Sequence, residues 1–267
     1  MTEINRYSMM LEALAELKPE LDAARRAQHQ QIQQPIPSQP SLNEVLAEFG
    51  PMPSEALFLG VASDGLPVLL NMHDPVPGPL LLCGDGGTGK TAFLQTIALA
   101  AGQMHHPEEL QFGVLTSHPD EWNSLESIPN NVGVFPLYHN SSEDFILSLA
   151  SWAHGNKTSQ QSVLLLLDDL EAATNLEFDA KQNLRWLLLR GPARRVWPIT
   201  SLNPNRMENI LPWLDAFHTR IFSPIQDSGH TRLLGAETAN LNSLNNGTQF
   251  ALREGENWLR FWIPCID

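Results

Sequence analysis

Cysteines are scarce in this sequence of 267 residues, which contains only Cys83 and Cys265. Two cysteines cannot form a disulfide framework, and their separation does not match a metal-binding pattern. A disulfide-stabilised secreted domain and a zinc module are therefore excluded. No apolar run approaches the ~20 residues that a helix needs to span a bilayer, and the N-terminus lacks the apolar centre of a signal peptide. We expect a cytoplasmic protein with no integral membrane segment.

Positive charge is also scarce, and it is unevenly distributed. The formal net charge is −14, and the only Lys or Arg between residues 27 and 156 is Lys90, against 13 Asp and Glu. Contacts with nucleic-acid phosphates need clustered cations, so this half of the chain is not a broad nucleic-acid surface. Of the 16 basic residues, 11 fall in 157–267. A polyanion would have to be met there, or by loops gathered around the pore of an oligomer.

What the sequence does contain is a glycine-rich segment, GPLLLCGDGGTGKTAF, at residues 78–93. Its apolar run at 79–83 indicates a buried strand. The eight residues from Gly84 to Thr91 fill every position of the phosphate-binding loop G-x-x-x-x-G-K-[S/T]. A helical pattern begins near Lys90. A strand, this loop and a helix, in that order, predict a nucleotide-binding site.

The residue types of the loop suit a nucleoside triphosphate. Glycines allow backbone N–H groups to surround phosphate oxygens at close range, and the N-terminus of the following helix adds a positive end. Lys90 is expected to bridge the β- and γ-phosphates, and the Thr91 hydroxyl to hold Mg²⁺. The predicted cofactors are therefore ATP and Mg²⁺. The predicted binding residues are Gly84, Asp85, Gly86, Gly87, Thr88, Gly89, Lys90, Thr91 and Ala92.

The same segment also fits the dinucleotide fingerprint G-x-G-x-x-G, through Gly84, Gly86 and Gly89. That fold needs an acidic residue at the end of the second strand, about 20 residues further on. Here the second strand ends with LTSH at 115–118, which contains no acid, and the Lys-Thr pair would have no role. The phosphate-loop interpretation is therefore favoured.

A second part of the site is expected in the strand VLLLLDDLE at 163–171. Asp168, at the carboxyl end of the strand, is placed to hold Mg²⁺ opposite Thr91. The next position usually carries a longer acid that activates the attacking water, and here it is the shorter Asp169. Glu171 shares that face if the chain stays extended. Lys90, Asp169 and Glu171 are the candidate catalytic residues, and hydrolysis depends on whether one of the two acids replaces the missing glutamate.

Two further groups of polar residues are weaker candidates. After the strand at 196–201, the side chains of Thr200, Ser201 or Asn203 are candidate sensors of the γ-phosphate, with ordinary loop chemistry as the alternative. Five arginines are candidates for a finger that reaches a neighbouring subunit's nucleotide, although a solvated surface role is simpler for each. They are Arg190, Arg194, Arg195, Arg206 and Arg220.

Three regions are expected along the chain. Residues 1–34 have the apolar spacing of an amphipathic helical segment, which packs back on the protein or meets a protein partner. Residues 35–55 are a Gln/Pro-rich linker followed by a short helix, opened by a capping box at Ser41. Residues 56–267 form the main domain, which starts with a β-hairpin.

Within this domain, alternating strand and helix patterns predict an α/β fold with a mostly parallel sheet and helices on both faces. The expected strands are 56–62, 66–72, 79–83, 110–116, 132–137, 163–168, 196–201, 219–223, 248–252 and 258–263. The expected helices are 90–104, 143–154, 179–190, 206–211 and 228–234. The last two strands are expected to form an antiparallel hairpin at the edge of the sheet.

Residues 57–263 resemble the FtsK–HerA group of P-loop motor ATPases, with features of FtsK/SpoIIIE and EccC-type domains. The segments that carry the resemblance are GPLLLCGDGGTGKT, VLLLLDDLE and NNGTQFALREGENWLRF. The resemblance implies a RecA/FtsK-like P-loop NTPase sheet that binds ATP and Mg²⁺. It also implies a homo-oligomer, hexameric in such rings, that acts on a DNA or protein cargo. Asp168-Asp169 departs from the usual Asp-Glu of FtsK-type domains, and the usual Gln sensor near Leu202 is missing.

Two functions therefore remain open. The first is an ATP-hydrolysing motor subunit that translocates a polymer through a ring, with DNA modestly favoured over protein by family frequency. The alternative is a nucleotide-binding scaffold or regulatory subunit, weak in hydrolysis and EccC-like, in a secretion, conjugation or DNA-processing complex. A metabolic kinase is disfavoured, because no lid with an arginine cluster follows the loop.

Overall fold

The computed structural model describes residues 39–156, 159–254 and 257–266. The predicted helical segment at 1–34 and the start of the predicted linker lie outside this range. The strands are β1 (Ala56–Ala62), β2 (Pro67–Asn71), β3 (Leu80–Cys83), β4 (Leu110–Thr116), β5 (Asn131–Pro136), β6 (Ser162–Leu167), β7 (Val196–Leu202), β8 (Thr219–Phe222), β9 (Gln249–Glu254) and β10 (Asn257–Trp262). The α-helices are α2 (Leu42–Phe49), α3 (Lys90–Met104), α4 (Asn140–Gly155), α5 (Phe178–Arg190) and α6 (Ser228–Leu233). Shorter 3₁₀ segments are η1 (Pro119–Leu125), η2 (Leu170–Asn175), η3 (Pro192–Arg194), η4 (Pro204–Ala216) and η5 (Leu241–Ser243).

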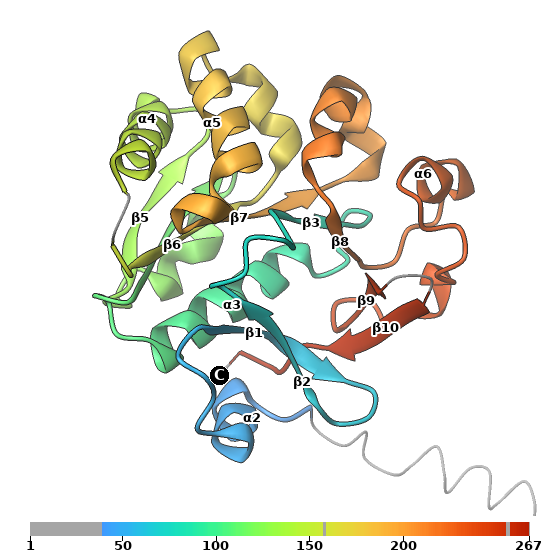
Figure 1. Cartoon of the computed structure of the whole chain (residues 1–267). Helices are drawn as coiled ribbons and strands as arrows, with labels where there is room; N and C mark the ends of the chain where they lie inside the picture. The colour runs from blue at the N-terminus through green and yellow to red at the C-terminus, as the bar shows by residue number, and fades with distance from the viewer. Residues whose placement is uncertain (1–38, 157–158, 255–256, 267) are drawn as a thin grey trace, which may run out of the picture. The chain divides into compact units, whose positions relative to one another are not determined.

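The strands form one ten-stranded sheet in the order β2-β1-β10-β9-β8-β3-β7-β6-β4-β5 (Figure 1). From β8 to β5 every neighbouring pair is parallel, and from β8 to β2 every pair is antiparallel. The prediction of an α/β fold with a mostly parallel P-loop sheet is confirmed. Because β3, β6 and β7 run in the same direction, their carboxyl ends meet at one edge of the sheet, where parallel α/β folds place their ligands.

The prediction that the last two strands lie at the edge of the sheet is wrong. The hairpin of β9 and β10 lies inside the sheet, with β8 on one side and β1 on the other, and β2 forms the edge. The aromatic side chains of the hairpin explain this position. Phe250 and Phe261 are fully buried against Phe93 of α3, with ring centroids 4.8 and 6.0 Å from that of Phe93. Aromatic rings contribute most to stability when they are fully buried. A position between two neighbouring strands keeps water away from the rings of the hairpin.

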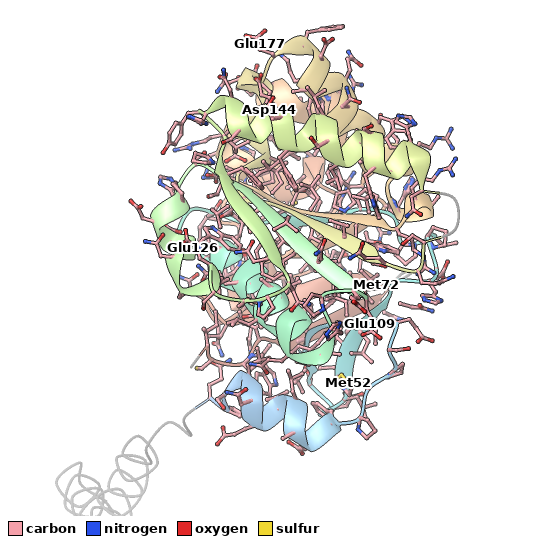
Figure 2. The ribbon with its side chains drawn as sticks, turned by 90° about the vertical axis from the view of Figure 1, so that its left-hand side faces the viewer. Met52, Met72, Glu109, Glu126, Asp144 and Glu177 are labelled. Carbon is pink, nitrogen blue, oxygen red and sulfur yellow. The ribbon has the colours of Figure 1, made fainter. Side chains whose placement is uncertain are left out.

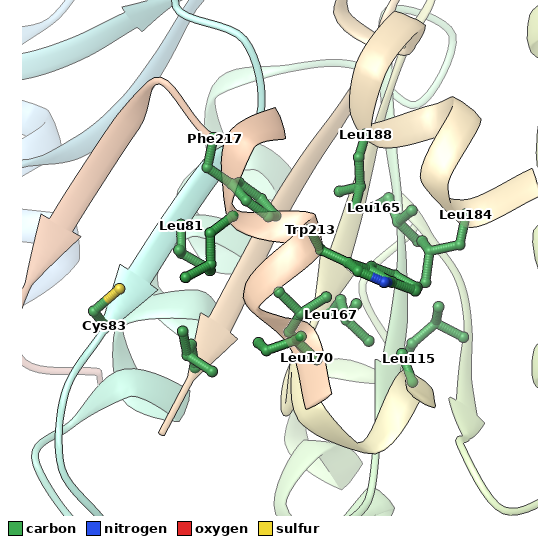
Figure 3. Close-up of a cluster of buried hydrophobic side chains, with 14 of the residues drawn as sticks. Leu81, Cys83, Leu115, Leu165, Leu167, Leu170, Leu184, Leu188, Trp213 and Phe217 are labelled. Carbon is green, nitrogen blue, oxygen red and sulfur yellow. The ribbon is translucent and has the colours of Figure 1, made fainter. Parts of the chain in front are cut away.

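Helices cover both faces of the sheet. Figure 2, in which Asp144 marks α4 and Glu126 follows η1, shows α4 on one side of the strands and α3 with η1 on the other. Two large apolar cores result. One packs α4, α5 and η4 on the sheet, and the other packs α3 and η1 on the opposite face. In the first core, Trp213 of η4 lies among Leu184 and Leu188 of α5 and the strand residues Leu165 and Leu167 (Figure 3).

The short helix predicted after the linker is confirmed as α2. The Ser41 hydroxyl accepts the N–H of Glu44, and the Glu44 carboxylate accepts the N–H of Ser41, so the predicted capping box is formed. Leu42 and Val45 then pack in a small third core against β1 and α3. None of the helices in the described ranges combines the length and apolarity that a bilayer crossing needs.

The helix predicted at 206–211 differs from the structure. The chain instead forms a longer series of 3₁₀ turns, η4, which contains Pro212. Proline has no N–H for an α-helical hydrogen bond and clashes with the preceding turn. A regular α-helix therefore cannot run through this segment.

Candidate functional site

A cavity of about 420 Å³ lies at the edge of the sheet where β3 and β6 end and α3 begins. It brings together residues from the glycine loop, η1, the end of β6, η2 and the start of η4. They are Gly86, Gly87, Gly89, Lys90, Thr91, Ala92, Glu121, Asp168, Asp169, Glu171, Asn203 and Arg206. The two segments that sequence motifs single out therefore meet at one cavity, where Thr91 and Asp168 are 77 positions apart in the chain.

The loop follows its path because two of its glycines leave no room for a side chain. A Cβ at Gly84 would collide with the Ser223 hydroxyl. Gly89 has φ +89°, and a Cβ there would lie 2.6 Å from the Cα of Gly247. Gly89 is also the residue that caps the N-terminus of α3. The loop is thus wedged against the segments after β8 and before β9, with its remaining face towards the cavity.

The side chains of Asp85 and Thr88 hold the loop in place from behind. The Asp85 carboxylate accepts the N–H of Gln226 at 2.8 Å. The Thr88 hydroxyl donates to the Asp85 carbonyl at 2.8 Å and lies 2.7 Å from the Ser223 hydroxyl. Both residues belong to the predicted loop, and the structure gives their side chains a supporting place. Sequence analysis missed Ser223 and Gln226, because the segment after β8 contains no recognisable motif.

Lys90 folds back over its own loop. Its ammonium group donates to the carbonyls of Gly84 at 2.9 Å and Asp85 at 2.7 Å. Burial lowers the pKa of Lys90, and the nearby carboxylates of Glu171 and Asp168 oppose this shift. The side chain of lysine has a flexible stem, so the Lys90 ammonium group can leave the two carbonyls and contact phosphate oxygens instead.

Thr91 and Asp168 form the pair expected to hold a divalent cation. The Thr91 hydroxyl donates to Asp168 Oδ2 at 2.8 Å, and the Ser201 hydroxyl donates to Asp168 Oδ1 at 2.6 Å. Asp168 is 4% exposed, and burial raises the pKa of its carboxyl group. A hydroxyl and one carboxylate are hard oxygen ligands, which fit Mg²⁺ when substrate phosphates and water complete its shell. The described ranges contain no cluster of three or more His, Cys, Asp or Glu that could hold a metal ion by itself.

The chain does not stay extended after Asp168, contrary to the condition set for Glu171. Asp169 has a left-handed backbone with φ 77°, and its N–H donates to the Ser201 hydroxyl at 2.9 Å. The chain turns there into η2, which contains Glu171. Glu171 nevertheless lines the cavity: the N–H of Asn203 donates to its Oε2 at 3.4 Å. Burial raises the pKa of Glu171. A folded turn, rather than an extended strand, brings both acids to the site.

The three candidate sensors have different surroundings. The Thr200 hydroxyl is fully buried and donates to the Leu80 carbonyl at 3.4 Å, so it faces the interior of the sheet. Ser201 connects Asp168 to the backbone of Asp169. Asn203 lines the cavity, which makes it the one of the three that remains a candidate sensor.

The five arginines are also separated. Arg220 donates to three backbone carbonyls, those of Phe217, Leu234 and Leu214, at 3.0–3.2 Å. Arg195 donates to the Gln160 side chain at 2.8 Å, and Arg194 to the Asn156 carbonyl at 3.5 Å. These three contribute to internal contacts. Two remain as candidates for phosphate contact: Arg206 lines the cavity of its own chain, and Arg190 is exposed at the end of α5.

Comparison with known proteins finds a family model and solved structures that are similar to this chain. Residues 58–136, from β1 to the end of β5, match the model of the FtsK/SpoIIIE family. Comparison with curated proteins gave no match.

Several solved structures share the fold. EssC (ATPases 2 and 3) from Geobacillus thermodenitrificans is similar at a TM-score of 0.68 and 14% identity, over 87% of this chain and 48% of that chain. The cytoplasmic domain of the type VII secretion ATPase EccC from Thermomonospora curvata has a TM-score of 0.63 and 15% identity, over 85% and 32%. The pCW3 conjugation coupling protein TcpA, solved with ATPγS, has a TM-score of 0.60 and 12% identity, over 86% and 71%. The chain spans about a third to a half of the EccC and EssC structures, and at these identities the likeness shows the fold alone.

Proposed function

We propose, from the premise that the chain has the fold of an FtsK-like P-loop ATPase domain, that it binds ATP with Mg²⁺ and hydrolyses it to move a polymer through an oligomeric ring. The observation that carries this proposal is the meeting of three groups at one cavity. They are the Lys90 ammonium group, the Thr91–Asp168 pair and the N-terminus of α3. Together they match the charge and the metal requirement of a nucleoside triphosphate.

Each group has a definite task in this proposal. The loop amides and the start of α3 bind the phosphate chain, and Lys90 leaves its two loop carbonyls to contact the β- and γ-phosphates. Thr91 and Asp168 would hold Mg²⁺, which when bound neutralises charge on the phosphate oxygens. Ser201 keeps Asp168 oriented through its 2.6 Å hydrogen bond. Asn203 is placed to sense the terminal phosphate.

The test of the site compares two lysine variants. Lys90→Ala should abolish ATP binding measured by calorimetry, and phosphate release with it. Lys181→Ala is the matched control. Lys181 lies on α5, and its ammonium group donates to the carbonyl of Thr174 in η2, away from the glycine loop. ATP binding should survive in the control. Normal ATP binding by Lys90→Ala would show that the site is assigned wrongly.

DNA is the first cargo to test, because the family resemblance favours it. If the chain is a DNA motor, duplex DNA should stimulate ATP turnover, and the stimulation should fall steeply as salt is raised. TcpA, one of the similar structures, is a conjugation coupling protein. Stimulation that is absent at every salt concentration would contradict a DNA cargo.

A second function, a nucleotide-binding subunit of an assembly that handles polypeptide, is favoured by the arginines. Arg194, Arg195 and Arg220 are hydrogen-bonded to protein groups, so these three are less available to a phosphate backbone, and the formal net charge of the protein is −14. EccC and EssC, two of the similar structures, are ATPases, and EccC is a type VII secretion ATPase. Tight ATP binding without turnover under any condition would favour this function over the motor.

The oligomer is a separate part of the proposal. Solution mass with and without ATP tests whether subunits form a ring, and a hexamer is the expected product. Removal of residues 1–34 tests the predicted amphipathic segment. If the truncated chain still forms the oligomer, the segment is not needed for the ring, and we expect it to bind another protein.

A further inference from the structure

Glu171, one of the two acids that the sequence offers in place of the usual glutamate, occupies an unusual position. It belongs to η2, yet it lines the same cavity as Lys90, Thr91 and Asp168. One of its oxygens, Oε2, accepts the N–H of Asn203 at the end of β7. The other oxygen, Oε1, is buried and has no hydrogen-bond partner within the described residues. Leaving a buried polar atom without a partner is costly, and such atoms gather at sites that bind something.

The electrostatic interaction between Glu171 and Lys90 is a second observation on the position of Glu171. Among the carboxylates near Lys90, Glu171 has the strongest electrostatic effect on the ammonium group, ahead of Asp168 and Asp169. Lys90 is the group expected to contact the γ-phosphate. Glu171 and Lys90 line the same cavity, so the Glu171 carboxylate shares that cavity with the terminal phosphate that Lys90 is expected to contact.

Asp169, at the position where a water-activating glutamate usually stands, is constrained by its backbone. Its φ of 77° lies in the left-handed region, which only Gly, Asn and Asp adopt with any frequency. Its N–H is tied to Ser201, which is itself bonded to Asp168. The Asp169 carbonyl accepts the N–H of Ala172 and so starts η2. The residue thus forms the turn that brings Glu171 over the cavity.

We propose that Glu171, rather than Asp169, is the catalytic residue that activates water for attack on the γ-phosphate. In this step the water oxygen forms a bond to the γ-phosphorus, and the bond between that phosphorus and the β–γ bridging oxygen breaks. The bridging oxygen leaves on ADP with the electron pair. One water proton passes to the Glu171 carboxylate, and from there to the released phosphate or to solvent. Asp169 is a positioning residue, which holds the turn.

This inference rests on the proposed hydrolysis, and three matched carboxylate-to-amide variants test it. Glu171→Gln keeps an oxygen that can accept the Asn203 N–H but cannot take a proton. A general base contributes about 10²–10⁴-fold to rate, so Glu171→Gln should lower kcat at least about 100-fold. Its affinity for ATP and its melting temperature should stay close to those of the parent. Asp169→Asn should lower kcat less than about tenfold. Glu126→Gln, at an exposed acid outside the cavity, should leave kcat, the affinity for ATP and the melting temperature unchanged.

The outcomes separate the two levels of the proposal. If the parent protein turns ATP over and Glu171→Gln does so at a similar rate, the assignment of Glu171 is wrong and the proposed function stands. If Asp169→Asn loses the larger factor, Asp169 is the base and the assignment is also overturned. If the parent protein binds ATP but releases no phosphate under any condition, hydrolysis itself fails, and the role of Glu171 fails with it. A loss of ATP affinity or melting temperature in Glu171→Gln, with kcat unchanged, would show a structural role only.

Discussion

At position 89 the backbone has φ +89° and lies against the backbone of Gly247. A side chain there would meet two separate costs, the strain of the left-handed region and a collision that backbone atoms cannot avoid. Gly89→Ala should therefore destabilise the protein by clearly more than the 1–2 kcal/mol of strain alone, and it should abolish ATP binding, because the loop and the start of α3 must move. Urea unfolding and calorimetry measure the two effects.

Gly65 offers the matched control for this substitution. It has a nearly equal φ of +84°, in the turn between β1 and β2, but a Cβ there meets nothing within 4 Å. Gly65→Ala should show the strain alone, about 1–2 kcal/mol, with ATP binding unchanged. Equal losses of stability in both variants would mean that the contact with Gly247 does not constrain the loop.

Single residues also show what the sequence could predict about the site. Gly84, Lys90 and Thr91 were predictable because one contiguous pattern contains them, and Asp168 because it ends an apolar strand. Lys90, Thr91 and Asp168 line one cavity, while the roles of all four residues stay predictions. The supporting bonds of Ser201 and Ser223 were not predictable in this form, because they join residues 33 and 135 positions apart. Such contacts depend on strand order, which local patterns do not contain.

At the scale of elements, His105 joins the C-terminus of α3 to the start of β1. Its ring Nε2 donates to the Ala56 carbonyl at 3.0 Å, and the residue is 5% exposed. Burial lowers the pKa of His105 below its usual value near 6.5, and the Ala56 carbonyl and Glu109 oppose the shift. The side chain borders a second cavity, of about 250 Å³, where Met72 and Glu109 lie close together in Figure 2. The charged and titratable groups around it are Glu55, His73, Glu108, Glu109 and Arg195.

The sign of the pH effect follows from this shift. A histidine with a lowered folded-state pKa gives stability that is present above the unfolded pKa, near 6.5, and is lost as pH falls through the folded value. The contribution of His105 to the unfolding free energy should therefore drop between pH 7.5 and pH 5.5. His105→Gln, which keeps an N–H donor but does not titrate, should reduce this drop in urea unfolding. His106→Gln, at the exposed neighbouring residue, should leave the drop unchanged. Equal pH dependence of both variants would contradict the role of His105.

Elements were easier to predict than their arrangement. The bounds of α3 and β4 agree with the predicted ranges because each has a clear apolar pattern and a clear end. The position of the β9–β10 hairpin was wrong because sequence order does not specify which strand a hairpin pairs with. Its aromatic side chains, buried against α3, determine that position. The 3₁₀ conformation of η4 was missed because an apolar spacing suggested an α-helix. Pro212, inside the segment, prevents a regular α-helix there.

At the scale of the whole molecule, the proposed ring would allow one subunit to contribute an arginine to its neighbour's nucleotide site. A finger supplied by a neighbouring subunit would be complemented when two defective subunits are mixed, since one can lack the lysine and the other the arginine. Arg206 lines the cavity of its own chain, so we expect it to act within its own subunit. Arg190 is exposed at the C-terminal end of α5 and is free of that limit.

We therefore expect the two arginines to behave differently in mixed oligomers. Arg206→Ala should lower turnover by about tenfold or more, and equal mixing with Lys90→Ala subunits should restore nothing, because no site then holds both Lys90 and Arg206. If Arg190 is the finger, Arg190→Ala should lose about 10³-fold, and mixing with Lys90→Ala should restore a fraction of the rate. That fraction comes from Arg190→Ala sites that receive an arginine from a Lys90→Ala neighbour. Recovery in the Arg206 mixture would show that Arg206 acts between subunits, and that the cavity of one chain is only part of the working site.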